Sequence, residues 1–503
     1  MTKLRPGSLS AGVATAFMAL AACTPSGTTP TPTPPPQATL AASPSPTSPL
    51  CAANQAWVQS PSQPDLQVEP TNHCQFYQYA WQSFLYLMSP SSGADSPAVF
   101  ETWPAVDEVF GSSAATLAAP KGAKLFTAVD PRSKTKRLHF FRKRVNKAGG
   151  RLAADGTPIG GEDTQAGSGG ILVDQTGNIT YYEQFLDPNA AVPFIKACTL
   201  TVKACQSAAG AAALRFPAGS LELKVSWRPL WKTTPGVKSY YLIPGSPVEN
   251  AKGQTVTPDY FGLVGFHLVY VTPGQPEMVW ATFEHADNAP TAPCVDGQTT
   301  CGQFPPGSPR WSYNNCEAKT CAGVNTWPSP VPSPVPTTQA FLEYAYGTSP
   351  SLIDAAKVSG SDNIAILQAL NKSVAAILPA GSVWRSYSQS GAVWTLNGVL
   401  PAVPYYNSSG QPNAAFNEVG STFLANSTME TFTQFPNPIP SPFPSPPPRQ
   451  NCFSCHNSTP PTRGSFLVSH AFFAAKDPSA CTWSATPPAA CAATQPSAAV
   501  AKK

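Results

Sequence analysis

Charged residues are scarce in this 503-residue sequence, at 12% of the chain. The formal net charge is only +4, too small to favour a nucleic-acid partner. The sequence also contains 58 prolines and 35 glycines, a composition typical of a loop-rich globular protein with unstructured tracts and not of a helical bundle. Hydrophobic residues at 42% and aromatic residues at 10% still provide enough apolar surface for a core.

Several signatures of common enzymes are also missing. The sequence has no GxSxG, no HExxH and no phosphate-binding loop, so it gives no sign of the usual hydrolase, zinc-protease or nucleotide chemistry. No internal repeat is present. The apolar stretch from Ala11 to Ala22 carries no charge but is too short to span a bilayer.

That stretch instead completes a targeting signal. Lys3 and Arg5 precede it, and it ends in Leu-Ala-Ala-Cys at Cys23, which resembles the lipobox of bacterial lipoproteins. We therefore expect residues 1–22 to be removed and Cys23 to carry the lipid anchor, which gives the protein a membrane partner. The alternative is an ordinary secretory signal with a chance cysteine, and either case predicts export. Position 24 is Thr and not Asp, which favours the outer membrane, on the periplasmic side.

Composition shifts divide the remaining chain. A linker after the signal is rich in Pro and Thr, and a second Pro-rich tract precedes the C-terminal segment. The sequence between these two tracts, called the body here, has the pattern of an α+β fold. The expected parts are a signal peptide at 1–22, a linker at 23–50, the body at 51–435, a Pro-rich tract at 436–449 and a haem c attachment segment at 450–503.

The sequence pattern of the body predicts helices beside an antiparallel sheet. Residues 74–88 place large apolar side chains at helical spacing, residues 98–110 indicate a short helix or a pair of helical turns, and residues 363–378 are amphipathic. Between about 124 and 290, segments rich in β-branched and aromatic residues are bounded by Pro or Gly, which indicates strands. Residues 382–400 suggest a hairpin. The expected fold class is α+β, an antiparallel β-rich body with flanking helices.

Thirteen cysteines occur in the sequence. Setting aside Cys23 for the lipid, and Cys452 and Cys455 for the motif described next, leaves ten, an even number that predicts disulfides in an exported chain. Close spacing favours sequential pairing, although spacing alone does not prove connectivity. The expected pairs are Cys51/Cys74, Cys198/Cys205, Cys294/Cys301, Cys316/Cys321 and Cys481/Cys491.

Residues 452–456 read CFSCH, which is a CxxCH motif. Thiols at Cys452 and Cys455 can add to the two vinyl groups of one haem, and His456 is then positioned as the proximal iron ligand. A zinc site would need two further ligands at a matching spacing, and none stands nearby. A redox CxxC more usually begins a helix in a βαβ unit. The motif therefore predicts one covalent haem c as cofactor.

The distal iron ligand stays open. The candidates are His470 downstream, Met429 just before the Pro-rich tract, either of His267 and His285 in strand-like sequence, or an open coordination position. Because only 47 residues follow His456, we expect the upstream body to complete the haem site.

Two charged clusters have weaker interpretations. Residues 132–151 carry nine Lys or Arg and no acid, which suggests a docking surface for an acidic redox partner, although a solvated hairpin flank would show the same pattern. Glu284, His285 and Asp287 form a second cluster, which suggests an acid–base or metal group but lacks further ligands.

Several motifs together resemble a family of largely uncharacterised exported bacterial cytochrome c-like proteins. They are CQFYQYAWQSFLYL, FETWPAVDEVF, GLVGFHLVYVTP, WATFEHADNAP and LANSTMETF followed by CxxCH, in this order over residues 74–460. The resemblance implies haem binding by Cys452, Cys455 and His456, and supplies no substrate.

We therefore expect a lipid-anchored mono-haem protein that acts in periplasmic electron transfer. The alternatives are a haem-dependent oxidoreductase of peroxidase or oxygenase type, with its substrate bound by the β-rich body, and a haem-based binding or sensor module. The body of roughly 400 residues is larger than haem wrapping alone requires, which keeps the enzyme alternative open.

Overall fold

The protein is described here by a computed structural model. The described residues are 51–65, 70, 72–93, 96–109, 125–129, 137–142, 170–197, 216–291, 311–315, 324–326, 332–348, 360–398, 417–432, 434 and 452–456. The chain divides into two units, Met1–Ser48 and Pro49–Lys503, and every described residue belongs to the second unit. Among the helices of this described part, none is both long and apolar enough to cross a membrane.

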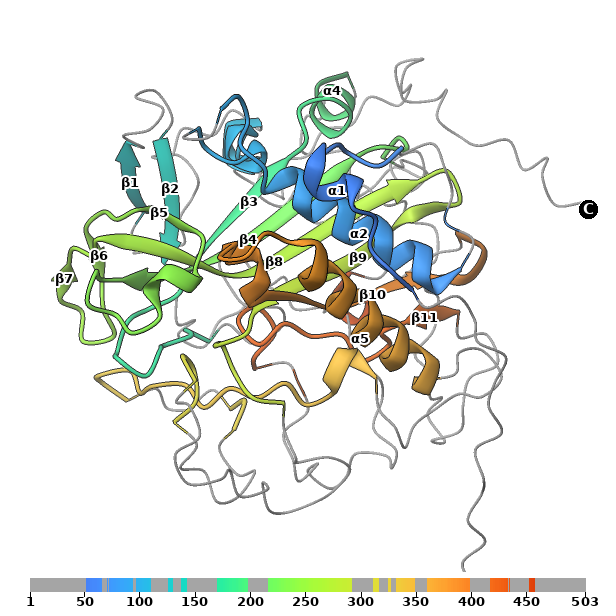
Figure 1. Ribbon diagram of the computed structural model, residues 1–503. Helices are drawn as coiled ribbons and strands as arrows, with labels where there is room; N and C mark the ends of the chain where they lie inside the picture. The colour runs from blue at the N-terminus through green and yellow to red at the C-terminus, as the bar shows by residue number, and fades with distance from the viewer. Residues whose placement is uncertain are drawn as a thin grey trace, which may run out of the picture. The chain divides into compact units, whose positions relative to one another are not determined.

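The described part of the chain combines strands, α-helices and short 3-10 turns (Figure 1). The strands are β1 (Leu125–Val129), β2 (Arg137–Arg142), β3 (Tyr181–Leu186), β4 (Leu221–Leu230), β5 (Leu242–Pro244), β6 (Val248–Glu249), β7 (Thr255–Val256), β8 (Tyr260–Thr272), β9 (Gln275–His285), β10 (Tyr387–Thr395) and β11 (Glu418–Gly420). The α-helices are α1 (Ala56–Gln59), α2 (His73–Leu87), α3 (Val106–Val109), α4 (Ala191–Ala197), α5 (Gly360–Ile377) and α6 (Cys452–Cys455). Short 3-10 turns lie at Val99–Thr102, Val237–Ser239, Ala345–Gly347, Val383–Ser386 and Leu396–Gly398.

One antiparallel sheet organises these elements. Its described strands number nine, in the order β1-β2-β3-β4-β8-β9-β10-β11, and β5 pairs with β8 beside this path. Every strand pair in it is antiparallel. The strands β6 and β7 form a separate two-stranded ladder. The structure therefore confirms the predicted α+β fold with a mostly antiparallel sheet and a few helices.

Helix α2 forms where the spacing of apolar residues predicted a helix. Asn72 caps its start, because the Asn72 side chain accepts a hydrogen bond from the backbone N–H of Gln75. A disulfide joins Cys51 to Cys74 in the first turn of the helix, which confirms that predicted pair. The other four predicted cysteine pairs lie outside the described residues.

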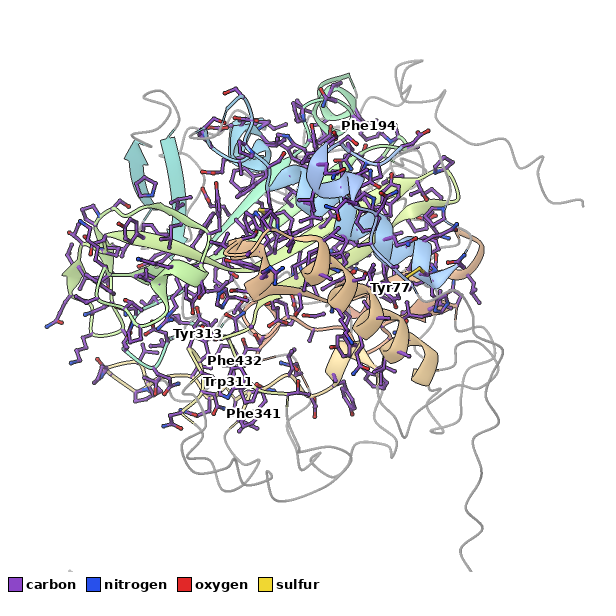
Figure 2. All side chains as sticks on the ribbon, viewed as in Figure 1. Tyr77, Phe194, Trp311, Tyr313, Phe341 and Phe432 are labelled. Carbon is purple, nitrogen blue, oxygen red and sulfur yellow. A yellow bond between two sulfur atoms is a disulfide. The ribbon has the colours of Figure 1, made fainter. Side chains whose placement is uncertain are left out.

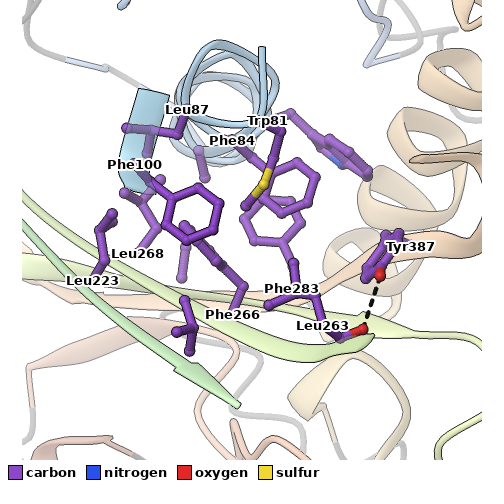
Figure 3. Close-up of a cluster of buried hydrophobic side chains, with 14 of the residues drawn as sticks. Trp81, Phe84, Leu87, Phe100, Leu223, Leu263, Phe266, Leu268, Phe283 and Tyr387 are labelled. Carbon is purple, nitrogen blue, oxygen red and sulfur yellow. Dashed lines mark hydrogen bonds between the residues drawn. The ribbon is translucent and has the colours of Figure 1, made fainter. Parts of the chain in front are cut away.

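The core lies between α2 and one face of the sheet (Figure 3). Phe84 is fully buried there, stacked on Phe283 of β9 at 4.3 Å between ring centroids and edge-on to Phe266 of β8 at 5.4 Å. Helix α5 lies beside α2, and Asn371 of α5 accepts a hydrogen bond from the indole of Trp81 at 2.8 Å. Two helices therefore cover this face of the sheet where Phe266 and Phe283 lie.

The structure confirms one prediction of local structure and contradicts another. Within the segment predicted as a pair of helical turns, Val99–Thr102 is a 3-10 turn and Val106–Val109 is α3, which confirms the prediction for the described residues. The hairpin predicted at 382–400 is wrong, because Val383–Ser386 is a 3-10 turn and β10 is one strand that pairs with both β9 and β11. Gly391 marks a bulge in the β9 pairing, where a side chain would collide with Ser421.

Candidate functional site

Alternate residues of β4, β8, β9 and β10 point away from α2, onto the second face of the sheet. The pairing register aligns these residues in three rows across the strands. The first row is Glu222, Val269, Trp280 and Val393; the second is Lys224, His267 and Thr282; the third is Ser226, Gly265, Glu284 and Ser388. Adjacent rows are about 7 Å apart along each strand, because two residues of a strand span that length.

The CxxCH motif lies against the first row. Residues Cys452–Cys455 form the single helical turn α6, which the backbone N–H of His456 extends by bonding to the Cys452 carbonyl at 2.8 Å. The ring centroid of His456 is 4.2 Å from that of Trp280, and the Phe453 ring is 6.2 Å from Trp280. Phe453 is 1% exposed, so it anchors the turn, while Cys452 and His456 are half-buried.

This turn fits a covalently attached haem. On a helix, positions three and four apart share one side, so the backbone brings positions 452, 455 and 456 together within one turn. Position 453 is rotated roughly 100° about the helix axis from position 452. The buried Phe453 therefore lies on a different side of the turn from the two cysteine positions. Two cysteines and a histidine on one arc are the donor set that haem c attachment requires.

A second polar segment covers the other two rows. Residues Asn426–Glu430 form a helical turn, in which the Glu430 N–H bonds to the Asn426 carbonyl at 2.9 Å. The Asn426 side chain caps this turn by accepting from the N–H of Thr428, and it donates to the hydroxyl of Thr282 at 2.8 Å. The carbonyl of Thr428 accepts from the Tyr182 hydroxyl at 2.7 Å. The segment is thus held on the sheet by hydrogen bonds along its length.

Glycine at position 265 permits this close approach. A Cβ at Gly265 would lie 2.6 Å from the Ser226 hydroxyl and 2.9 Å from the Asn426 side-chain oxygen, closer than real contacts allow.

Further along the chain, Gln434 bonds to the backbone of Phe341 and Glu343 at 2.8 Å each. Figure 2 shows Phe341 and Phe432 grouped with Trp311 and Tyr313, although these residues come from separate segments.

Met429 is carried by this turn and is 0% exposed. Its neighbour Glu430 contacts His267 of the second row, with 2.9 Å between the carboxylate oxygen and Nε2. Burial alone would raise the pKa of Glu430, but the charges of His267 and Lys224 and a bond to His267 outweigh it, so this pKa is lowered. The candidate distal ligand His267 therefore lies on the face that also carries Trp280, and the candidate Met429 is buried in the turn that covers this face.

His285 lies on the opposite face, because it is adjacent to Glu284 on one strand. Its ring stacks on Tyr240 at 3.8 Å, its Nε2 bonds to the Ser239 carbonyl, and its Nδ1 accepts from the Asp287 N–H. With Nε2 donating and Nδ1 accepting, the imidazole has no nitrogen available for iron. Burial lowers its pKa to about 4, despite the nearby Asp287 charge. The structure thus opposes both the iron-ligand role of His285 and a joint Glu284–His285 site.

Glu284 lies in the third row beneath the Asn426–Glu430 turn. Its carboxylate accepts from the Ser427 N–H at 3.0 Å, from the Ser427 hydroxyl, and from the Ser390 hydroxyl at 3.3 Å. Burial raises the pKa of Glu284 to about 7, although these bonds lower it. Glu284 therefore ties β9 to the segment that carries Met429.

We expect the stability of the protein to depend on pH through Glu284. Because its pKa is raised from 4.5 to about 7 on folding, its stabilising contribution is present below pH 4.5 and is lost as pH rises through 7. The unfolding free energy of Glu284→Gln minus that of wild type should therefore rise by about 3 kcal/mol between pH 4.5 and pH 7. Urea denaturation at a series of pH values measures this difference. The titration of His285 does not affect it, because both proteins contain His285. A difference that does not change with pH contradicts the prediction.

The comparisons with known proteins give no relative. No family model, no curated protein and no solved structure matches this chain. Among the described residues, no group of three or more His, Cys, Asp or Glu side chains could hold a metal ion.

Several predicted residues fall outside the described part. They are Cys23, the candidate distal ligand His470, and most of the basic segment 132–151, of which only the backbone of β2 is described. Conversely, sequence reasoning missed Trp280. Its alternation with Val279 and Ala281 in β9 could have placed it on the second face, but its contact with His456 depends on how a segment some 170 residues later docks.

Proposed function

We propose that the chain is an exported, lipid-anchored, mono-haem c-type cytochrome-like protein acting in periplasmic electron transfer. The observation that carries this proposal is the docking of the CxxCH turn on Trp280, on the sheet face that the turn with Met429 covers. In this proposal Cys452 and Cys455 form the thioethers and His456 is the proximal iron ligand. When bound, the haem would supply a reversible one-electron iron couple.

We propose Met429 as the distal ligand. Met429 is fully buried in the turn that covers the sheet face of Trp280, and its thioether needs no deprotonation to bind iron. His267 is the less favourable choice, because its Nε2 already contacts Glu430. Methionine ligation would favour a higher reduction potential than a second histidine would. His470 is the remaining alternative, and the same experiment tests it.

The setting of the protein completes the proposal. Residues 1–22 would direct export, Cys23 would carry the anchor, and the linker 23–50 would separate the body from the outer membrane, on the periplasmic side. Segment 132–151, with nine positive charges, would dock an acidic redox partner. Membership of the exported cytochrome c-like family belongs to the same proposal.

The absorption spectrum of the purified haem-loaded protein tests the ligand assignment. We expect wild type to be low-spin in both redox states and unreactive toward CO and peroxide. Met429→Ala should become high-spin, whereas His267→Ala and His470→Ala should keep the wild-type spectrum. Met88→Ala is the matched control, because Met88 is 3% exposed at the end of α2 and its truncation also removes a buried thioether.

Three outcomes would overturn parts of this proposal. A low-spin Met429→Ala spectrum excludes Met429 as the ligand. Loss of the low-spin form in His470→Ala transfers the role to His470. A high-spin ferric wild type that reacts with peroxide replaces electron transfer with the oxidoreductase function. The haem assignment itself fails if denatured protein shows no haem-linked mass.

A further inference from the structure

Trp280 carries a buried hydrogen-bond donor that the described chain does not satisfy. The side chain is only 6% exposed, and its Nε1 has no hydrogen-bond partner among the described residues. An indole N–H can donate but cannot accept, so only an acceptor can satisfy it. Leaving such a donor buried and unpaired destabilises the folded chain, because the donor has lost its hydrogen bond to water.

Other buried indoles in this protein do find acceptors. Trp227 donates to a carboxylate oxygen of Glu183 at 2.7 Å, and Trp81 donates to Asn371 at 2.8 Å. Trp311 also lacks an acceptor but is only half-buried. The unmet donor of Trp280 lies on the surface where the CxxCH turn docks.

The two residues directly opposite Trp280 on the neighbouring strands offer no acceptor side chain. In the first row it is flanked by Val269 on β8 and by Val393 on β10, both aliphatic. The Phe453 ring covers it from the docked turn. The nearby imidazole of His456 has one nitrogen committed to iron in the proposed function, and its other nitrogen then bears hydrogen.

A haem brings the missing acceptor. Its propionate carboxylates are the groups at its rim that accept strong, charge-assisted hydrogen bonds. We propose that Trp280 Nε1 donates a hydrogen bond to a haem propionate, which makes Trp280 a positioning residue for the haem; this inference rests on the proposed haem function. The bond stabilises the ionised carboxylate, so it lowers the pKa of that propionate.

The test compares two Trp→Phe variants of the full haem-loaded chain. Trp280→Phe removes the donor and keeps an aromatic ring against His456. Trp384→Phe is the control, because Trp384 packs on Tyr241 at 5.1 Å in the aromatic cluster below α2. The measurement is the midpoint potential as a function of pH, in which ionisation of a propionate gives an inflection. Losing a bond to a charged group worth about 1.4 kcal/mol should move that inflection up by about one pH unit in Trp280→Phe, and Trp384→Phe should superimpose on wild type.

A second measurement observes the indole N–H of Trp280 directly. In ¹⁵N-tryptophan-labelled wild type, the indole resonance of Trp280 is the one missing from Trp280→Phe. It should move downfield relative to the haem-free Cys452→Ser/Cys455→Ser protein. An unchanged resonance together with superimposable pH curves overturns the inference and leaves the haem assignment intact. Absence of covalent haem in wild type overturns both.

Discussion

A chain in which Cys452 and Cys455 are both replaced by serine is expected to carry no covalent haem. A thioether needs a thiol sulfur, and serine cannot add to a haem vinyl group in its place. The helical turn at 452–455 should still form, because serine fits the same backbone. Haem staining of denaturing gels and intact mass of the exported protein measure the result.

The matched control removes the other described pair of cysteines. The Cys51→Ser/Cys74→Ser protein lacks the disulfide that pins the start of α2 and should lose about 2–4 kcal/mol of unfolding free energy. It should nonetheless retain the haem, because the CxxCH motif is unchanged. A haem-linked mass in the Cys452→Ser/Cys455→Ser protein would contradict the assignment of the attachment site.

Truncating Phe84 should produce the largest loss of stability of any single change considered. Phe84→Ala removes a fully buried ring from between α2 and the sheet, where it packs on Phe266 and Phe283 (Figure 3). Losses for such truncations are about 3–5 kcal/mol, a large fraction of the 5–15 kcal/mol typical of a whole domain. Urea denaturation followed by far-ultraviolet circular dichroism measures the change.

An exposed charge provides the comparison. Lys232 and Asp259 form a surface pair with 3.8 Å between their charged atoms, and the Lys232 side chain is 73% exposed. Lys232→Ala should change the unfolding free energy by less than about 0.5 kcal/mol. Equal losses in Phe84→Ala and Lys232→Ala would mean that the α2–sheet interface does not form the core.

The elements of the fold were predictable where one local pattern decides them. Helix α2 follows from the spacing of Tyr77, Trp81 and Phe84, and β8 and β9 follow from runs of β-branched and aromatic residues. The hairpin at 382–400 failed because Gly391 has two interpretations, a turn or a close packing contact. Only the position of Ser421, thirty residues later, decides between them.

The candidate site was predictable only in part. Cys452, Cys455 and His456 could be named because their chemistry depends on a spacing within five residues. That the turn with Met429 covers the face of Trp280 could not, because it depends on the register of β4, β8 and β9 and on where the Asn426–Glu430 turn lies. The opposite orientations of Glu284 and His285 follow from strand alternation and were available from the sequence once β9 was recognised.

The docked position of Phe453 constrains the order in which the protein matures. With Phe453 1% exposed against the sheet and Cys452 half-buried, an enzyme that ligates haem cannot grip residues 452–456 as an extended peptide once they have docked. Under the proposed function, ligation therefore precedes docking.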